Sequence, residues 1–237
     1  MSGQGQSYER DERWTSVDQY SFSHLHPSSS FPTNEHLSRA LTYSQEQGLP
    51  DIAVSPSQGK FLKLQAQIAR ARNVLEVGTL GGYSTIWLAS ASPDVRVVSV
   101  EVDPHHAEVA RENIRRAGLE ERVDVRVGAG VDVLKAIAEE VKEGKLGAFD
   151  LVFVDADKEN NWNYVNAALG FSNKGAVVIV DNVVRKGQLS QAGTGDPRIE
   201  GARLVVEKIG ADDRLDGVVV QTVGEKNYDG FVIAVVK

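Results

Sequence analysis

The sequence contains no cysteine among its 237 residues. This absence excludes disulfide bonds, thiolate metal ligands and a cysteine nucleophile, so oxygen or imidazole groups must hold any bound metal. A chain without cysteine suits a reducing compartment, and we therefore expect a cytoplasmic protein.

Long apolar runs and basic clusters are also missing. No stretch approaches the roughly 18 uninterrupted apolar residues of a membrane-spanning helix, and residues 1–13 lack the apolar core of a signal peptide. The net charge of −7 comes without a long basic stripe, which disfavours binding to the phosphate backbone of a nucleic acid. We expect no membrane partner, no nucleic-acid partner and a small-molecule substrate.

From residue 73 onward, short β-branched runs alternate with helical segments. This alternation is typical of a parallel sheet with helices on both faces, and the runs are almost continuously apolar, as doubly covered strands should be. The predicted strands are residues 73–78, 96–101, 123–127, 149–155 and 176–181. The predicted crossover helices are residues 83–91, 104–117, 132–142 and 158–169.

The two ends of the chain follow other patterns. After a predicted helix at 198–209, the runs 217–223 and 231–236 flank a turn-like segment, which predicts a hairpin that closes the sheet. Helices at 36–47 and 57–71 are expected outside the sheet. Residues 1–32 are polar and Ser-rich and are expected to form a flexible segment ahead of a single α/β domain at 33–237.

A glycine-rich loop between Glu76 and Ser84 closes the first predicted strand and opens the first crossover helix, where α/β folds bind nucleotides. Its glycines let the backbone approach a ligand, and Ser84 could bond that ligand or cap the helix. The spacing is not the G-x-G-x-x-G of a pyrophosphate site. An acidic residue ahead of the loop, Glu76, suits a ligand with a cationic amino group and no phosphate, such as S-adenosylmethionine.

Glu101 ends the second predicted strand, 25 positions after Glu76. A carboxylate at this place can accept both hydroxyls of a ribose. The alternative is that Gly81 and Gly82 only make a tight turn and that Glu101 is a solvated strand end.

Acidic residues also end the fourth and fifth predicted strands. Asp155, Asp181 and Asn182 should meet at one edge, because the carboxyl ends of neighbouring parallel strands form the ligand crevice of α/β sheets. Two carboxylates and an amide oxygen suit Mg²⁺ and leave positions open for a substrate with two adjacent phenolic oxygens. Lys158 can face the same cleft. The alternatives are that the two Asp residues cap helices or loops and that Lys158 is a solvated surface lysine.

With these residues, the chain resembles the cation-dependent O-methyltransferases, the family that includes caffeoyl-CoA O-methyltransferase and catechol O-methyltransferase. The resemblance extends over roughly residues 35–237. It rests on the order and spacing of residues 57–62, 76–84, 101–103, 155–158, 181–182 and 228–231.

The resemblance implies a Rossmann-like methyltransferase fold, with a seven-stranded sheet that ends in an antiparallel hairpin, and a homodimer. It implies Lys158 as the base near the reacting hydroxyl, and Asp155, Asp181 and Asn182 as ligands of Mg²⁺, with Mn²⁺ or Ca²⁺ as alternatives. The implied contacts of S-adenosylmethionine are Glu76, Gly78, Thr79, Ser84, Glu101, Gly130 and Asp155, with Gly130 against the adenine.

Departures from the family pattern lie on the substrate side. Asn161 stands where many relatives carry Tyr, and Val184-Arg185-Lys186 replaces the Leu-Trp stretch of the plant caffeoyl-CoA enzymes. These differences disfavour a caffeoyl-CoA ester. The segment 229–231 looks more like microbial and fungal members, which act on varied catechols and phenolic natural products.

The predicted function is therefore metal-dependent O-methylation of a small catechol-type or phenolic substrate. One alternative is a nicotinamide-dependent oxidoreductase, which the loop spacing disfavours and cofactor binding would distinguish. A second is a metal-independent small-molecule N-methyltransferase, which insensitivity to chelators would reveal. A third is a non-catalytic binding protein that keeps the cofactor fold.

Overall fold

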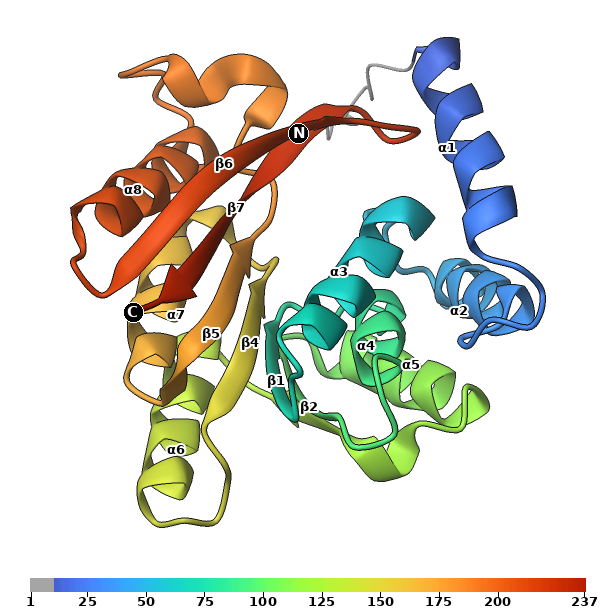
Figure 1. Cartoon of the computed structure of the whole chain (residues 1–237), viewed down its shortest axis with the longest axis horizontal. Helices are drawn as coiled ribbons and strands as arrows, with labels where there is room; N and C mark the ends of the chain where they lie inside the picture. Colours follow the sequence, from blue (N-terminus) through green and yellow to red (C-terminus); the bar gives the residue numbers. More distant parts are fainter. Residues whose placement is uncertain (1–10) are drawn as a thin grey trace.

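A seven-stranded sheet forms the centre of the computed structural model, which describes residues 11–237 (Figure 1). The strand order is β3-β2-β1-β4-β5-β7-β6, in which β1 to β5 are parallel and β7 runs antiparallel to both β5 and β6. The predicted sheet and its final hairpin are thus confirmed. The strands are β1 (Asn73–Val77), β2 (Arg96–Glu101), β3 (Val123–Val127), β4 (Phe149–Val154), β5 (Ser172–Val180), β6 (Leu215–Val223) and β7 (Tyr228–Val236).

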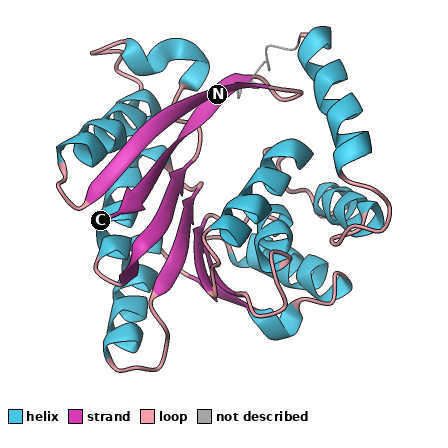
Figure 2. Cartoon of the chain, in the orientation of Figure 1, coloured by secondary structure: helices cyan, strands magenta, loops and turns pink. Residues whose placement is uncertain are grey.

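Helices lie on both sides of this sheet (Figure 2). One side carries α2 (Asn34–Glu46), α3 (Pro56–Ile68), α4 (Tyr83–Ala89) and α5 (Pro104–Arg116). The other side carries α6 (Gly130–Lys142), α7 (Asn161–Leu169) and α8 (Pro197–Ala211). Short 3₁₀ segments are η1 (Glu120–Arg122), η2 (Lys158–Asn160) and η3 (Arg185–Ser190). None of the helices in residues 11–237 is long and apolar enough to cross a membrane.

The central strands are buried on both faces, which explains their apolar sequences. In β4, Leu151 and Phe153 pack into the core under α3 to α5, whereas Val152 and Val154 pack into the core under α6 to α8. Successive side chains of a strand point to opposite faces, so one apolar run fills two cores.

The start of the described chain contains a helix that the sequence analysis did not predict. Residues Glu12–Leu25 form α1, which begins after Asp11, whose side chain accepts the backbone N–H of Arg13. Tertiary contacts account for this helix. Asp18 accepts hydrogen bonds from the Ser57 hydroxyl at 2.9 Å and from the Glu225 backbone N–H at 2.9 Å. Residues 1–10, which belong to the same predicted segment, lie outside the described residues.

Glu76 in β1 is fully buried and joins three elements. Its carboxylate accepts the Ser84 and Thr85 hydroxyls of α4 at 2.6 and 2.5 Å, and the Ser99 hydroxyl of β2 at 2.5 Å. Burial raises the pKa of Glu76 to about 7, although these three hydroxyls oppose the rise. Because α4 begins after Gly82 without a side-chain cap, this carboxylate is what fixes its first turn.

Glu76→Gln should remove a pH-dependent part of the stability. The pKa rises from 4.5 to about 7 on folding, so the folded state favours the protonated carboxyl. The contribution of Glu76 is complete below about pH 4.5 and is lost as the pH rises through about 7. Because glutamine cannot ionise, the free energy of unfolding of the variant relative to the wild type should increase across this window, by up to about 3 kcal/mol. Urea denaturation of both proteins at several pH values measures this difference, and a constant difference would contradict the prediction.

Gly59→Ala should destabilise the packing of α3 on α4. An added Cβ would lie 2.3 Å from Cδ1 and Nε1 of Trp87, which is fully buried and has no room to move. Overpacking of this kind costs about 1–3 kcal/mol. The control is Gly210→Ala in α8, where nothing lies within 4 Å of the added Cβ. There, alanine should leave the stability unchanged or raise it by up to about 1 kcal/mol. Denaturant unfolding of both variants checks the opposite signs.

Candidate active site

A cavity of about 1310 Å³ follows the carboxyl ends of β1, β2, β4 and β5. Its rim includes Asp18 of α1 and the hairpin between β6 and β7, which lies close to α1 in Figure 1. Pockets for one small ligand usually measure about 300–1,000 Å³, so this cavity has room for two ligands side by side.

The cavity brings together almost all of the predicted site residues. Those on its wall are Gly78, Thr79, Ser84, Glu101, Gly130, Asp155, Lys158, Asp181 and Asn182. Glu76 is the exception. It is fully buried behind the glycine-rich loop and is not among the lining residues, because three hydroxyl groups hold its carboxylate inside the fold. Its contact with the cofactor stays a prediction.

Gly78 shows why a glycine is required at the end of β1. Its φ is +105°, a region that side chains rarely adopt, and an added Cβ would lie 2.3 Å from the backbone oxygen of Asp155. Gly82 at the start of α4 also has a positive φ, of +77°. The loop therefore turns tightly and keeps its backbone against the end of β4, as the glycine pattern predicted.

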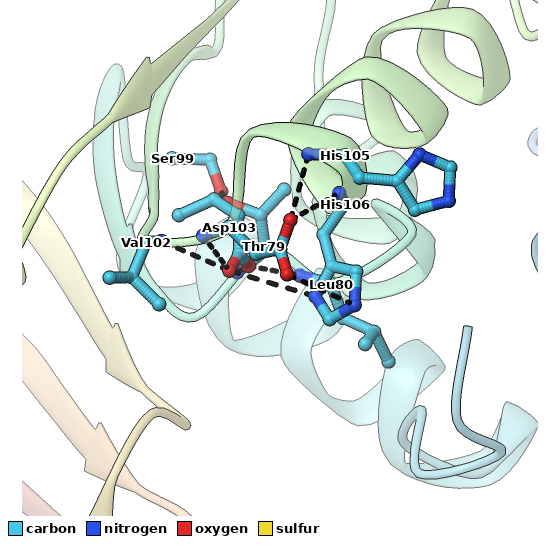
Figure 3. Close-up of polar contacts among 8 residues, drawn as sticks. Thr79, Leu80, Ser99, Val102, Asp103, His105 and His106 are labelled. Carbon is cyan, nitrogen blue, oxygen red and sulfur yellow. Dashed lines mark hydrogen bonds and ion pairs between the residues drawn. The ribbon is translucent and has the colours of Figure 1, made fainter. Parts of the chain in front are cut away.

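Glu101 at the end of β2 turns toward this loop. Its Oε2 accepts the backbone N–H groups of Thr79 and Leu80 at 3.2 and 2.7 Å. Its Oε1 accepts those of Val102 and Asp103 at 3.0 Å each. Figure 3 shows these two backbone segments side by side at the start of α5. A carboxylate has about four acceptor positions, so a bound ribose would have to replace some of these backbone donors.

Gly130 lies at the first position of α6, beside an aromatic ring that the sequence analysis did not include. An added Cβ would lie 2.7 Å from Cε1 of Tyr164. The Tyr164 hydroxyl donates to Asp157 at 2.5 Å, and burial raises the pKa of Tyr164. All three residues line the cavity. Gly130 thus lets the Tyr164 ring pack against the start of α6, on the cavity wall.

The acids at the ends of β4 and β5 lie side by side because of the strand register. Val154 pairs with Val180, so Asp155 and Asp181 follow on neighbouring strands. The Asp181 backbone N–H donates to the Val154 carbonyl at 2.9 Å, which continues the ladder past the strand ends. Asn182 follows with a positive φ of 56°.

The charges of this group are only partly balanced. Burial raises the pKa of Asp181 to about 7, and the Asp155 carboxylate adds to the rise, while the Lys158 ammonium opposes it. Lys158 Nζ donates to Asp155 Oδ1 at 2.6 Å. Like charges held close together favour the binding of a further cation.

The donor set at this position fits a hard divalent cation. It offers two carboxylates and one amide oxygen on one wall, as the sequence analysis predicted. Over residues 11–237, no cluster of three or more His, Cys, Asp or Glu side chains is arranged to hold a metal ion. Any cation here would therefore need the Asn182 amide, water or a substrate to complete its shell.

Two wall residues escaped the sequence analysis as site groups. Gln58 of α3 hydrogen-bonds to Asp181 and lowers its pKa, and Asp18 of α1 also lines the cavity. Arg185 of η3, which the sequence analysis placed on the substrate side, lines it too. Gln58 lies within a segment on which the resemblance rests. The sequence of a helix outside the sheet, however, does not indicate which face of that helix lies against the site. Only the tertiary packing reveals these contacts.

Comparisons with known proteins agree with this geometry. Residues 28–234 match the family model described as O-methyltransferase. The chain is 46% identical over 234 residues to O-methyltransferase imqG of Aspergillus flavus, which covers 98% of this chain and 94% of that protein. It is 49% identical over 202 residues to a catechol O-methyltransferase of Mycobacterium tuberculosis, with coverage of 85% and 88%.

A solved structure shares the fold closely. The O-methyltransferase from Bacillus cereus, determined in complex with SAH, superposes with a TM-score of 0.87 at 47% identity and covers 95% of this chain and 99% of that one. The glycine-rich loop, the strand-end acids and the closing hairpin thus occur in a chain whose relatives are methyltransferases over nearly the whole length. This protein belongs to the S-adenosylmethionine-dependent O-methyltransferase family.

Proposed function

We propose that the protein is a divalent-cation-dependent O-methyltransferase that methylates a hydroxyl of a small catechol-type substrate. The observation that carries the proposal is the position of Asp155, Asp181 and Asn182 on one cavity wall, with Lys158 bonded to Asp155. The name of the Mycobacterium tuberculosis relative, a catechol O-methyltransferase, supports the substrate class.

S-adenosylmethionine, which supplies the methyl group, would occupy the side of the cavity formed by β1, β2 and α6. The backbone of Gly78 to Ser84 would lie against its amino-acid part, Glu101 would accept from its ribose, and Gly130 would lie against its adenine. The position of Gly78, Glu101 and Gly130 on the cavity wall supports this placement.

A divalent cation, when bound, would lower the pKa of a phenol and hold two adjacent oxygens in a fixed position. Asp155, Asp181 and the Asn182 amide would hold that cation. Mg²⁺ prefers such oxygen ligands, and the crowding of the buried Asp181 carboxylate against the partly buried Asp155 carboxylate supports this assignment.

Lys158 would remove the proton from the attacking hydroxyl. Its side chain is only 10% exposed, and it reaches into the cavity from the turn after β4. Holding acceptor and donor in line can contribute about 7–11 kcal/mol, so positioning by the cavity walls should supply much of the catalysis.

Because the chain belongs to the O-methyltransferase family, the alternative function as a nicotinamide-dependent oxidoreductase is excluded. A metal-independent transfer to an amine is the remaining enzymatic alternative. The response to chelators separates it from the proposed function.

Removal of divalent cations should abolish methyl transfer to a catechol. We expect EDTA to stop turnover and added Mg²⁺ or Mn²⁺ to restore it. Asp155→Asn and Asp181→Asn should each lower kcat at least about tenfold, because each removes a charged ligand. Assays with labelled S-adenosylmethionine measure this, and full activity in EDTA would refute the role of the metal.

Stability provides the control for these two variants. Asp181 is buried with a raised pKa, so Asp181→Asn removes an unfavourable charge and should not lower the free energy of unfolding near pH 8. Asp132→Asn, at an exposed position on α6, changes the same side chain away from the cavity and should keep full activity. Loss of folding in step with loss of activity would point to a structural role instead.

The Lys158 hypothesis predicts different outcomes for a base and for a simple positive charge. Lys158→Met should lower kcat by about 10²–10⁴, the usual contribution of a positioned general base. Lys158→Arg should not rescue the activity, because a guanidinium keeps its proton at accessible pH. Steady-state kinetics measure kcat, and calorimetric titration with S-adenosylmethionine should show unchanged cofactor affinity. A nearly active Arg variant would show that the charge alone is needed.

A further inference from the structure

Arg185, in the loop after β5, differs from the other cationic side chains on the cavity wall. Lys158 pairs with Asp155 at 2.6 Å, Arg198 with Asp196 at 2.8 Å, and Lys226 with Asp51 at 3.0 Å. Within residues 11–237, Arg185 forms no such ion pair. Its charge is therefore available to a ligand.

The guanidinium of Arg185 also has an unused donor. Its Nε atom is buried and has no hydrogen-bond partner among the described residues. A buried donor without a partner costs about 1–3 kcal/mol, so such groups usually serve a ligand or a bound water. An arginine presents its N–H groups as a planar fork that matches a carboxylate.

The backbone holds Arg185 in place at a conformational cost. Its φ is +52°, and those of Asn182 and Lys186 are both +56°, in a region that residues other than glycine seldom adopt. The Arg185 N–H donates to Asp229 Oδ1 at 2.9 Å, which ties the loop to β7. Strain of this kind persists where the surroundings enforce it, typically at functional sites.

Neighbouring acids do not take up the charge of Arg185. Asp229 is buried, and its Oδ1 accepts the backbone N–H groups of Arg185 and Gly230 at 2.9 and 3.0 Å. Asp196 is bonded to Arg198. Both acids lie near enough to Arg185 to feel its charge, yet neither forms an ion pair with it, and Asp196 pairs with Arg198 instead.

We propose that Arg185 binds a carboxylate of the acceptor, so that the preferred substrate is an acidic catechol. This inference rests on the proposed function, because Arg185 lies only three residues after Asn182, one of the groups assigned to the hydroxyl end of the acceptor. One end of the substrate would meet Asp181, Asn182 and Lys158, and its carboxylate would meet the guanidinium. The residue thus acts in substrate specificity.

The test compares protocatechuate, a catechol with a ring carboxylate, with its neutral amide. Wild-type protein should bind the acid more tightly than the amide, and Arg185→Gln should weaken binding of the acid by roughly ten- to a hundredfold while changing that of the amide less than about threefold. Calorimetry in the presence of S-adenosylhomocysteine and Mg²⁺ measures both affinities without turnover. Equal affinities in the wild type, or equal losses for both ligands, would overturn the inference.

Lys186→Gln is the matched control. It removes a positive charge from the next residue, at nearly the same φ, but Lys186 does not line the cavity, so the preference for the acid should remain. Arg185→Lys keeps the positive charge without the planar fork and should give an intermediate preference for the acid over the amide. This variant also tests the inference if Arg185→Gln fails to fold.

A parallel assay of methyl transfer distinguishes the two proposals. A loss of kcat/KM for the acid alone in Arg185→Gln supports both. Binding of the acid through Arg185 without any methyl transfer would count against the proposed function and still support the carboxylate subsite.

Discussion

The register of the parallel strands determines where the strand-end polar groups of the site lie. Strands β1, β4 and β5 each end in valine, and the ladder continues one residue beyond each of them. Gly78 N–H donates to the Val100 carbonyl at 2.9 Å, Asp155 N–H to the Val77 carbonyl at 2.8 Å, and Asp181 N–H to Val154 at 2.9 Å. A shift of one residue in any strand would turn the side chains that follow to the opposite face. The cores above and below the sheet prevent such a shift, because β1, β4 and β5 carry buried apolar side chains on both faces.

The strand register places two negative charges close together at the partly buried ends of β4 and β5. Asp155 and Asp181 are held close together by backbone geometry, not by mutual attraction, and Lys158 balances only part of their charge. Glu76, on the neighbouring strand β1, is fully buried and is held by three hydroxyls instead of a cation. The two aspartates line the cavity, whereas Glu76 does not. The aspartates can therefore bind a ligand, and Glu76 instead holds structural elements together.

The elements outside the sheet decide the shape of the acceptor side. α1 reaches the rim through Asp18, which joins Ser57 of α3 to Glu225 of the hairpin. Arg185 reaches the wall because Asp229 at the start of β7 fixes its backbone. These contacts link residues far apart in the chain, so the shape of this side of the cavity depends on the tertiary packing. The homodimer remains a prediction, since the structure contains one chain.

The sequence by itself determined the sheet, its hairpin and most of the cavity wall, because apolar periodicity and strand-end residues are local signals that a parallel sheet converts directly into position. Gly78, Asp155 and Asp181 were predictable for that reason. Only the tertiary structure decided that Glu76 is enclosed, that α1 forms, and that Arg185 is left without an acidic partner. Each of these outcomes depends on which group from another part of the chain contacts the side chain. A hydroxyl, a carboxylate or a backbone N–H from another element cannot be recognised in the local sequence pattern.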